Sequence, residues 1–261
     1  MQCNASTKLN FMEIQLIRNA TLRVHYNGRL FIIDPFLAAK ETIRSFAGIS
    51  QNPLVDLPCT PAEAIANAEM AIISHLHVDH FDPDAEALLP KTLPIFCQPG
   101  DEETIREKGF RQVTAVIDHI IWQGITLTRT PGQHGTGVWA ERMGNVSGFV
   151  WQADGEPTVY WAGDTIWHEP VADIIQKVQP DIIFTHSSGA KFGGSDPIVM
   201  DAAQTVAVCL AAPQATVVAV HLESLDHGTV SRADLRTLAN ENNVSEQQLL
   251  IPADGEQLKF S

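Results

Sequence analysis

Apolar and polar residues alternate in the first part of the chain, and the alternation returns near its middle. Three such segments open the chain, and the Asn27-Gly28 pair between the last two is typical of a tight hairpin turn. The pattern therefore predicts an antiparallel start. The alternating segments at residues 12–18, 20–26, 29–34, 125–130, 146–151 and 158–163 are all predicted to be strands.

Between and after these runs the pattern changes to buried strands that alternate with helices. Uniformly apolar segments predict buried strands at residues 70–74, 93–97, 181–186 and 215–220. Helices are predicted after a capping box that starts at Thr60, after the N-caps Asp82 and Asp101, and at residues 168–178, 197–212 and 231–241. No linker rich in Pro, Gly or Ser separates the halves. We therefore expect one α/β domain at residues 12–261, with two sheets between layers of helices, after a disordered lead-in at residues 1–11.

The composition is that of an acidic globular protein, with 44% hydrophobic and 18% charged residues. A total of 17 Lys and Arg against 31 Asp and Glu gives a net charge of −14, which disfavours binding to nucleic-acid phosphates. The longest apolar stretches are interrupted, and the first residues lack an apolar leader, so neither a membrane span nor a signal peptide is expected. The cysteines form no CxxC pair, which predicts reduced thiols and a cytoplasmic location, while a homo-oligomer stays open. They are Cys3, Cys59, Cys97 and Cys209.

A dense group of metal-binding residue types follows the apolar segment at residues 70–74. The sequence HLHVDH places three histidines and one aspartate within six residues, which chance rarely produces. Imidazole and carboxylate are ligands that Zn²⁺ and similar ions take, and alternate residues of an extended segment point to the same side. We therefore expect His75 and His77 to face one ion, and Asp79 and His80 to face a second position.

Three later residues are candidate ligands because each comes just after a predicted strand. They are His134, Asp164 and His221. An α/β sheet exposes its ligand-binding crevice at the carboxyl ends of its strands. We therefore expect these three residues to join the histidine cluster.

In this order and spacing the chain resembles the metallo-β-lactamase superfamily from Met12 onward, with HLHVDH as the HxHxDH motif. The resemblance implies a four-layer αβ/βα sandwich built of two similar halves. It also implies two divalent metal ions, with zinc expected first and manganese or iron compatible with the same donors. The implied ligands are His75, His77 and His134 for one ion, Asp79, His80 and His221 for the other, and Asp164 for both.

Within the superfamily the chain resembles the branch of L-ascorbate 6-phosphate lactonase and N-acyl-phosphatidylethanolamine phospholipase D. The similarity lies in Asp34-Pro35-Phe36, in Pro-Gly-Gln-His before and at His134, and in the late VHLESLDH. It implies that Asp34 orients a ligand histidine, although a loop-capping role is the alternative. Other candidates for lining the substrate cleft are His168, His186, His227, Lys191 and Arg142.

The two basic candidates bear on the charge of the substrate. Lys191 lies in a glycine-rich loop and Arg142 follows His134, so both could anchor an anionic group. The alternative for Lys191 is a solvated side chain on a flexible surface loop.

The predicted function is metal-dependent hydrolysis of a lactone, ester or phosphoester of a small molecule. A water molecule held between the ions would attack, and Asp79 would orient it or accept its proton. Two other classes stay open, a diiron redox protein and a non-catalytic metal-binding or ligand-binding module. The redox class needs an electron-donor domain that the sequence does not show, and the non-catalytic class predicts an incomplete ligand set.

Two further motifs are not expected to carry chemistry. The GxGxxA match at residues 135–140 follows a Pro-Gly turn and precedes no clear helix, which disfavours dinucleotide binding. The segment His186-Ser187-Ser188-Gly189 lacks the first glycine of a nucleophile elbow, which disfavours a catalytic serine.

Overall fold

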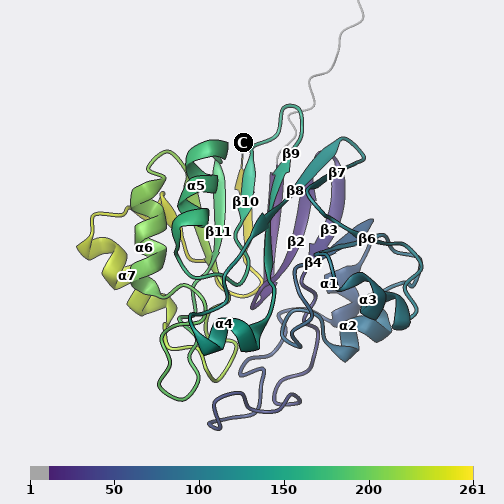
Figure 1. Cartoon of the computed structure of the whole chain (residues 1–261), viewed down its shortest axis with the longest axis horizontal. Helices are drawn as coiled ribbons and strands as arrows, with labels where there is room; N and C mark the ends of the chain where they lie inside the picture. The colour runs from purple at the N-terminus through teal and green to yellow at the C-terminus, as the bar shows by residue number, and fades with distance from the viewer. Residues whose placement is uncertain (1–11, 261) are drawn as a thin grey trace, which may run out of the picture.

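Two seven-stranded sheets lie at the centre of the fold, and helices cover their outer faces (Figure 1). A computed structural model describes residues 12–260, so the predicted disordered lead-in at residues 1–11 lies outside the described part of the chain. The four layers confirm the predicted αβ/βα sandwich with two similar halves.

The first sheet begins with an antiparallel meander and continues with parallel strands. Asn27 and Gly28 turn the hairpin between its second and third strands with φ of 50° and 68°. Helices α1 (Pro61–Ile65), α2 (Pro83–Leu88) and α3 (Glu102–Glu107) cover its outer face. In spatial order the strands are β14 (Gln257–Phe260), β1 (Met12–Arg18), β2 (Thr21–Tyr26), β3 (Arg29–Ile33), β4 (Met70–Ile73), β5 (Ile95–Cys97) and β6 (Val113–Ala115).

The second sheet has the same plan. Its strands β7 to β10 pair antiparallel and β10 to β13 pair parallel. Helices α5 (Glu169–Val178), α6 (Ala202–Ala211) and α7 (Arg232–Glu241) cover its outer face. In spatial order the strands are β13 (Leu249–Leu250), β12 (Thr216–Val220), β11 (Ile182–His186), β10 (Val159–Trp161), β9 (Ser147–Gln152), β8 (Ile125–Pro131) and β7 (His119–Trp122).

The inner faces of the two sheets share one apolar core. Phe31 of the first sheet packs edge-on against Trp151 of the second, with ring centroids 5.5 Å apart. Both side chains are fully buried, as are Trp161 and Phe184 beside them. Aromatic burial of this kind is a large part of the stabilisation that joins the two halves.

Several sequence predictions need correction. The helix expected at residues 197–212 begins at Ala202, because the Asp201 carboxylate caps it by accepting the Gln204 N–H. A short helix, α4 (Val138–Met143), follows Gly137 where none was expected. Asp101 does not cap α3, since its carboxylate accepts a hydrogen bond from Gln98 instead. The sequence pattern does not predict the short strands β6, β13 and β14.

Two expectations from composition can be compared with the structure. The cysteines at positions 59, 97 and 209 are free, whereas Cys3 lies outside the described residues. Within residues 12–260, no helix has both the length and the apolar character that crossing a bilayer requires.

The strands that precede the candidate ligands all end at the same side of the sandwich. In the first sheet β3 and β4 run parallel. In the second, β10, β11 and β12 are parallel, and β8 shares their direction because β9 pairs antiparallel with both β8 and β10. The loops that follow these strands therefore meet along one edge, beside α4 (Figure 1).

Candidate metal centre

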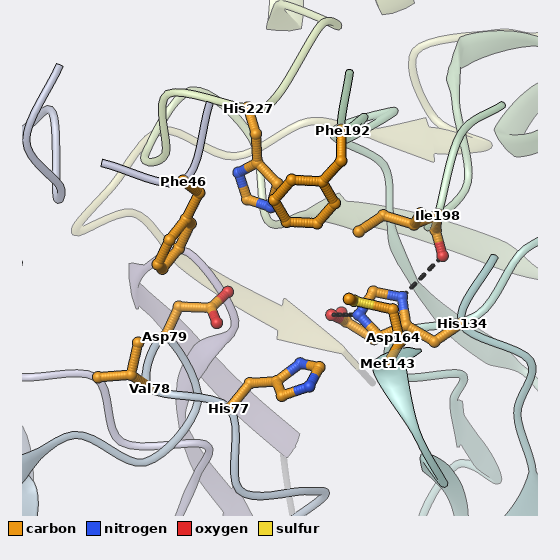
Figure 2. Close-up of a pocket in the computed structure, with 10 residues that line it drawn as sticks. All are labelled: Phe46, His77, Val78, Asp79, His134, Met143, Asp164, Phe192, Ile198 and His227. Carbon is orange, nitrogen blue, oxygen red and sulfur yellow. Dashed lines mark hydrogen bonds and ion pairs between the residues drawn. The ribbon is translucent and has the colours of Figure 1, made fainter. Parts of the chain in front are cut away.

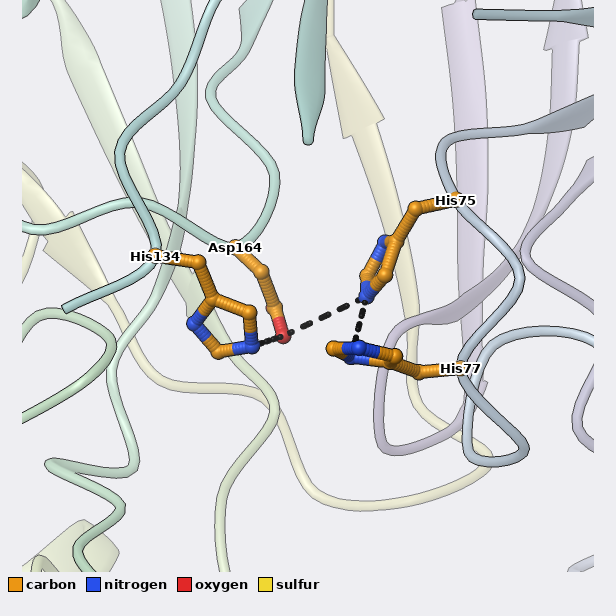
Figure 3. A group of neighbouring side chains, drawn as sticks. All are labelled: His75, His77, His134 and Asp164. Carbon is orange, nitrogen blue, oxygen red and sulfur yellow. Dashed lines mark hydrogen bonds and ion pairs between the residues drawn. The ribbon is translucent and has the colours of Figure 1, made fainter. Parts of the chain in front are cut away.

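Four side chains from three strand ends form a first group of possible metal donors (Figure 3). His75 and His77 follow β4, His134 follows β8 and Asp164 follows β10. His75 Nε2 lies 2.9 Å from His77 Nδ1, and Asp164 Oδ2 lies 3.3 Å from His134 Nε2. Each residue offers one donor atom, and these atoms lie within 4.8 Å of one another. Three imidazoles and one carboxylate form a donor set that suits a tetrahedral zinc ion.

A second group of four donors shares Asp164 with the first and adds His80, His186 and His221. Asp164 Oδ2 lies 3.2 Å from His80 Nε2. The other oxygen, Oδ1, lies 2.5 Å from His186 Nδ1 and 3.7 Å from His221 Nε2. Among residues 12–260, Asp164 is therefore the carboxylate that the two groups share, which is the place that the sequence resemblance implies for it.

Asp79 lies at the rim of the second group. Its Oδ2 is 3.2 Å from His221 Nε2 and 3.5 Å from His80 Nε2. The side chain also lines the adjoining pocket, so the carboxylate lies between the donor cluster and the space open to a substrate (Figure 2).

His186 occupies a different place from the one that the sequence suggested. The sequence made it a candidate for lining the substrate cleft, but the side chain is fully buried and is not among the pocket residues. It lies behind Asp164, at the end of β11.

Burial keeps two of the first-group histidines in the form that can bind a cation. It lowers the pKa of His75 well below its ordinary value, and the neighbouring His80 and His77 act in the same direction. Burial also lowers the pKa of His134 to about 4. Both imidazoles are therefore neutral at physiological pH, which leaves a lone pair free on one nitrogen of each ring.

Three carboxylates act on His80 of the second group. Burial opposes a proton on His80, yet Asp164, Asp79 and Asp34 together raise the pKa of His80 well above its ordinary value. Burial would also raise the pKa of Asp164, but His80 and His221 outweigh burial and keep that carboxylate ionised. The carboxylates thus attract positive charge, which a proton or a divalent cation can supply.

Several ring nitrogens of the donor groups have no hydrogen-bond partner, and this bears on whether the residues fit a metal. His80 Nε2, His186 Nε2 and both ring nitrogens of His221 are buried and make no hydrogen bond. A buried polar atom without a partner costs about 1–3 kcal/mol, so a folded protein rarely keeps several together without a use. Nitrogen donors left free beside ionised carboxylates fit divalent cations.

Hydrogen bonds behind the donors fix the orientation of the rings. The Asp34 carboxylate lies 2.7 Å from His80 Nδ1 and also accepts from the N–H and the hydroxyl of Ser74, at 2.8 and 2.7 Å. His134 Nδ1 donates to the Ile198 carbonyl at 2.8 Å, which leaves His134 Nε2 as the acceptor facing Asp164. Such contacts orient metal-binding histidines in proteins.

Asn19 is part of the site although sequence reasoning did not select it. Its side-chain amide donates to the Asp79 carbonyl at 3.1 Å, and its own carbonyl accepts the His221 N–H at 2.9 Å. Asn19 and His221 both have positive φ, 57° and 63°. Asparagine tolerates this conformation better than most residues, and this turn between β1 and β2 was the only signal in the sequence.

Gly163 allows the backbone turn that positions the shared carboxylate of Asp164. Gly163 has φ of 70°, and a Cβ atom there would lie 2.7 Å from the Ser147 carbonyl oxygen. The chain therefore needs glycine to turn from β10 into Asp164.

A pocket of about 200 Å³ opens onto the donor cluster (Figure 2). One side is formed by His77, Asp79, His134 and Asp164. The remaining lining residues are Phe46, Val78, Met143, Phe192, Ile198 and His227, which we call the apolar wall. The three ring side chains of this wall touch, because the His227 ring centroid lies 5.1 Å from that of Phe46 and 5.2 Å from that of Phe192.

Among the candidates for lining the cleft, only His227 lines this pocket. Lys191 and the N-cap residue of α5, His168, are half-buried elsewhere. Arg142 is exposed on α4, where its guanidinium stacks on Trp139 at 5.0 Å.

The contacts of Asp34 lead to a first prediction. Asp34→Asn is expected to weaken metal binding by about 10-fold to 100-fold, because one oxygen that faces His80 or Ser74 becomes an N–H donor. Asparagine can keep the positive φ of 43° found at this position, so the backbone should not change. Competition with a chelator of known affinity measures the change.

The control for this experiment is Asp154→Asn, which alters an exposed carboxylate between β9 and β10. Equal metal affinity in Asp34→Asn and the control would show that the Asp34 contact does not hold a ligand in place.

Comparison with known proteins agrees with this geometry. A profile described as "Beta-lactamase superfamily domain" matches residues 29–222. The chain is 35% identical over 255 residues to the UPF0173 protein YddR of Bacillus subtilis, covering 95% of this chain and 100% of YddR. The chain belongs to the UPF0173 family. Other members carry the name UPF0173 metal-dependent hydrolase, and this chain is a metal-dependent hydrolase of that family.

Two solved structures resemble this UPF0173 protein closely. One, from Veillonella parvula, is described as a possible metal-dependent hydrolase and has a TM-score of 0.91 at 34% identity, covering 95% of this chain and 99% of the other. The second is an isothiocyanate hydrolase from Delia radicum gut bacteria, with a TM-score of 0.89 at 35% identity over 96% and 99% of the two chains. The superfamily resemblance is thereby confirmed, whereas the finer resemblance to the lactonase and phospholipase branch is not.

Proposed function

We propose that this UPF0173 protein hydrolyses a small neutral molecule in which an electrophilic carbon is joined, directly or through one heteroatom, to an apolar substituent. Lactones, esters and isothiocyanates are substrates of this kind. The observation that carries the proposal is the pocket, in which the donor cluster faces the apolar wall. None of the described residues that line it is a lysine or an arginine.

The side chains that line the pocket support neutral substrates over phosphoesters. Asp79 and Asp164 line the pocket, whereas Lys191 and Arg142 do not. Divalent ions at the donor groups would offset the charge of these carboxylates, but no lysine or arginine of the pocket wall is present to hold an anionic group beyond the ions. The proposed order is therefore neutral carbon electrophiles first and phosphoesters second.

Isothiocyanate is the substrate class that the similar structure from Delia radicum gut bacteria suggests. Its N=C=S group is neutral, and the central carbon accepts a nucleophile. Hydrolysis transfers the oxygen of water to that carbon and both hydrogens to nitrogen. The C–N bond then breaks, which gives a primary amine and carbonyl sulfide. The same pocket would hold the organic substituent against the apolar wall.

The donor groups, Asp79 and the apolar wall have different roles in the proposed reaction. Divalent ions held by the two donor groups would lower the pKa of a water molecule and polarise the electrophile. Asp79 is placed to accept the proton of that water, because it is the carboxylate at the rim that faces the pocket. It would then return a proton to the leaving nitrogen or oxygen. The apolar wall holds the substituent and excludes bulk water.

A substrate panel tests the proposal. With the zinc-loaded and the manganese-loaded protein, kcat/KM for 2-phenylethyl isothiocyanate or a neutral p-nitrophenyl ester should exceed that for p-nitrophenyl phosphate by about 100-fold or more. That ratio corresponds to about 2.7 kcal/mol of differential transition-state binding. A preference for phosphate substrates that Lys191→Ala or Arg142→Ala weakens through KM would overturn it and favour an anionic substrate.

The same metal-loaded protein distinguishes the proposed hydrolase from the two alternative classes. A diiron redox protein would be coloured when loaded with iron and would turn over none of these substrates. A non-catalytic module would also bind metal and turn over none of these substrates, but it would show neither the colour nor the redox response.

A further inference from the structure

One buried carboxylate outside the donor groups holds a whole loop in place. Asp226 accepts hydrogen bonds from the Ser45 hydroxyl at 2.5 Å and from the Phe46 N–H at 2.9 Å. Its other donors are the N–H groups of Ala47, Ile49 and Ser50 at 3.2, 3.2 and 3.3 Å, and the side-chain amide of Asn52 at 2.9 Å.

In this loop, residues 45–52, Phe46 packs against the apolar cluster of Phe36, Ala38 and Leu225, and Asn52 is buried. Residues 47–51 are exposed, and Ile49 has 76% of its surface accessible. Asn52 strengthens the link by accepting the Asp226 N–H at 2.8 Å. The hydrogen bonds from Ser45, Asn52 and the backbone outweigh burial and hold the pKa of Asp226 well below its ordinary value. Asp226 is therefore ionised and can accept from many donors at once.

The loop brings Phe46 into the apolar wall. Figure 2 shows Phe46 and His227 side by side across the pocket from His77. His227 directly follows Asp226 in the chain, and its ring meets Phe46 edge-on with centroids 5.1 Å apart. Asp226 thus joins two segments that are far apart in sequence and that each supply one ring to the wall.

We infer that Asp226 is a positioning residue that sets the preference of the pocket for bulky apolar substituents. By fixing the 45–52 loop it holds Phe46 against His227, so that the wall offers a continuous surface to a ring. This inference rests on the proposed function in one respect, namely that the apolar wall receives the substituent. Asp226 does not line the pocket and is not a catalytic residue.

Binding of two simple thiols tests the inference without any substrate. 2-Phenylethanethiol and ethanethiol share a zinc-binding thiol and differ in the phenyl ring. Calorimetry with the zinc-loaded protein should show about tenfold tighter binding of the phenyl compound, the gain expected from burying a ring in part. In Asp226→Asn this ratio should fall to about twofold, because an amide cannot accept from all the loop donors. The control Asp154→Asn should keep the ratio of the unmodified protein.

Two further variants separate positioning from general damage. In Phe46→Ala the ratio should already be low, and adding Asp226→Asn should not lower it further, because Asp226 acts through Phe46. Ser45→Ala removes one loop donor and leaves the carboxylate, so it should give an intermediate ratio if Asp226→Asn does not fold. Trypsin provides a separate measure of loop position, since cleavage after the exposed Arg44 should rise about fivefold or more in Asp226→Asn.

Three outcomes would contradict the inference about Asp226. An unchanged ratio in Asp226→Asn together with faster cleavage at Arg44 would show that the loop moves without setting the preference. An equal loss of affinity for both thiols would indicate a purely structural role, and no preference in the unmodified protein would show that the wall does not receive a ring. Failure of the proposed function is a separate result, because absence of turnover does not alter the thiol ratio.

Discussion

Asp164→Ala is expected to leave fewer than one tightly bound metal ion per chain and to reduce hydrolysis to the level of the metal-free protein. The reason is that Asp164 belongs to both donor groups, whereas every other donor belongs to one. Its loss removes the shared carboxylate, whose oxygens lie 3.2 Å from His80 Nε2, 2.5 Å from His186 Nδ1 and 3.7 Å from His221 Nε2. We expect a loss of about 10⁴-fold or more in kcat/KM, since metal-assisted activation of water is lost.

Elemental analysis after dialysis against a weak chelator measures the ion count. His77→Ala serves as a comparison, because it removes a donor from the first group alone. It should abolish turnover while retaining about one ion of the two proposed. The exposed control Asp154→Ala should keep both metal and activity. Two ions bound to Asp164→Ala, or no transition metal in the unmodified protein after metal-supplemented expression, would contradict the shared-ligand arrangement.

Much of the donor cluster could be predicted because its signal is local. HLHVDH is contiguous, and His134, Asp164 and His221 each follow an apolar strand. Parallel strands bring their carboxyl ends to one edge, so strand prediction alone indicates that these residues meet. The structure brings all seven predicted ligands together, and their roles as ligands stay predictions that the metal measurements test.

The apolar wall could not be predicted, because long loops supply it. Phe46 lies in a loop whose position depends on Asp226, which is 180 residues away along the chain. Phe192 stacks on Trp139 of the unexpected helix α4, with ring centroids 5.1 Å apart. No periodic pattern marks such contacts, since the residues that make them lie in loops or in one short helix. For the same reason, the sequence alone allows Lys191 in the glycine-rich loop to be interpreted as an anchor for an anion.

The role of His186 shows a limit of another kind. The sequence places it correctly at the end of a buried strand, beside the other strand ends that carry ligands. It could not distinguish a ring that faces the substrate from one that lies behind Asp164. That difference depends on the side-chain direction at the last residue of β11, which the strand pattern does not determine at its end.

Asp79→Asn is expected to separate metal binding from turnover. The first donor group does not include Asp79, so the ion at His75, His77 and His134 should remain bound. The second ion should bind more weakly, because a neutral amide is a poorer ligand than a carboxylate. With excess zinc, kcat should still fall by about 10²-fold to 10⁴-fold, the range for losing a general base, and KM should change little.

The matched control for this test is Asp101→Asn. Asp101 is a half-buried carboxylate that lines a neighbouring cavity together with His77, and it accepts a hydrogen bond from Gln98 at 2.9 Å. Asp101 is not part of either donor group, so this variant should keep kcat within about twofold.

Metal content and turnover together decide what Asp79 does. If Asp79→Asn keeps two ions and the full rate, the carboxylate neither accepts the proton nor matters as a ligand, and the base must be sought elsewhere in the pocket. If excess zinc restores the rate completely, Asp79 acts only as a ligand for the second ion. A low rate with both ions bound is the result that we expect, because the Asp79 carboxylate lies beside His221 and also lines the substrate space.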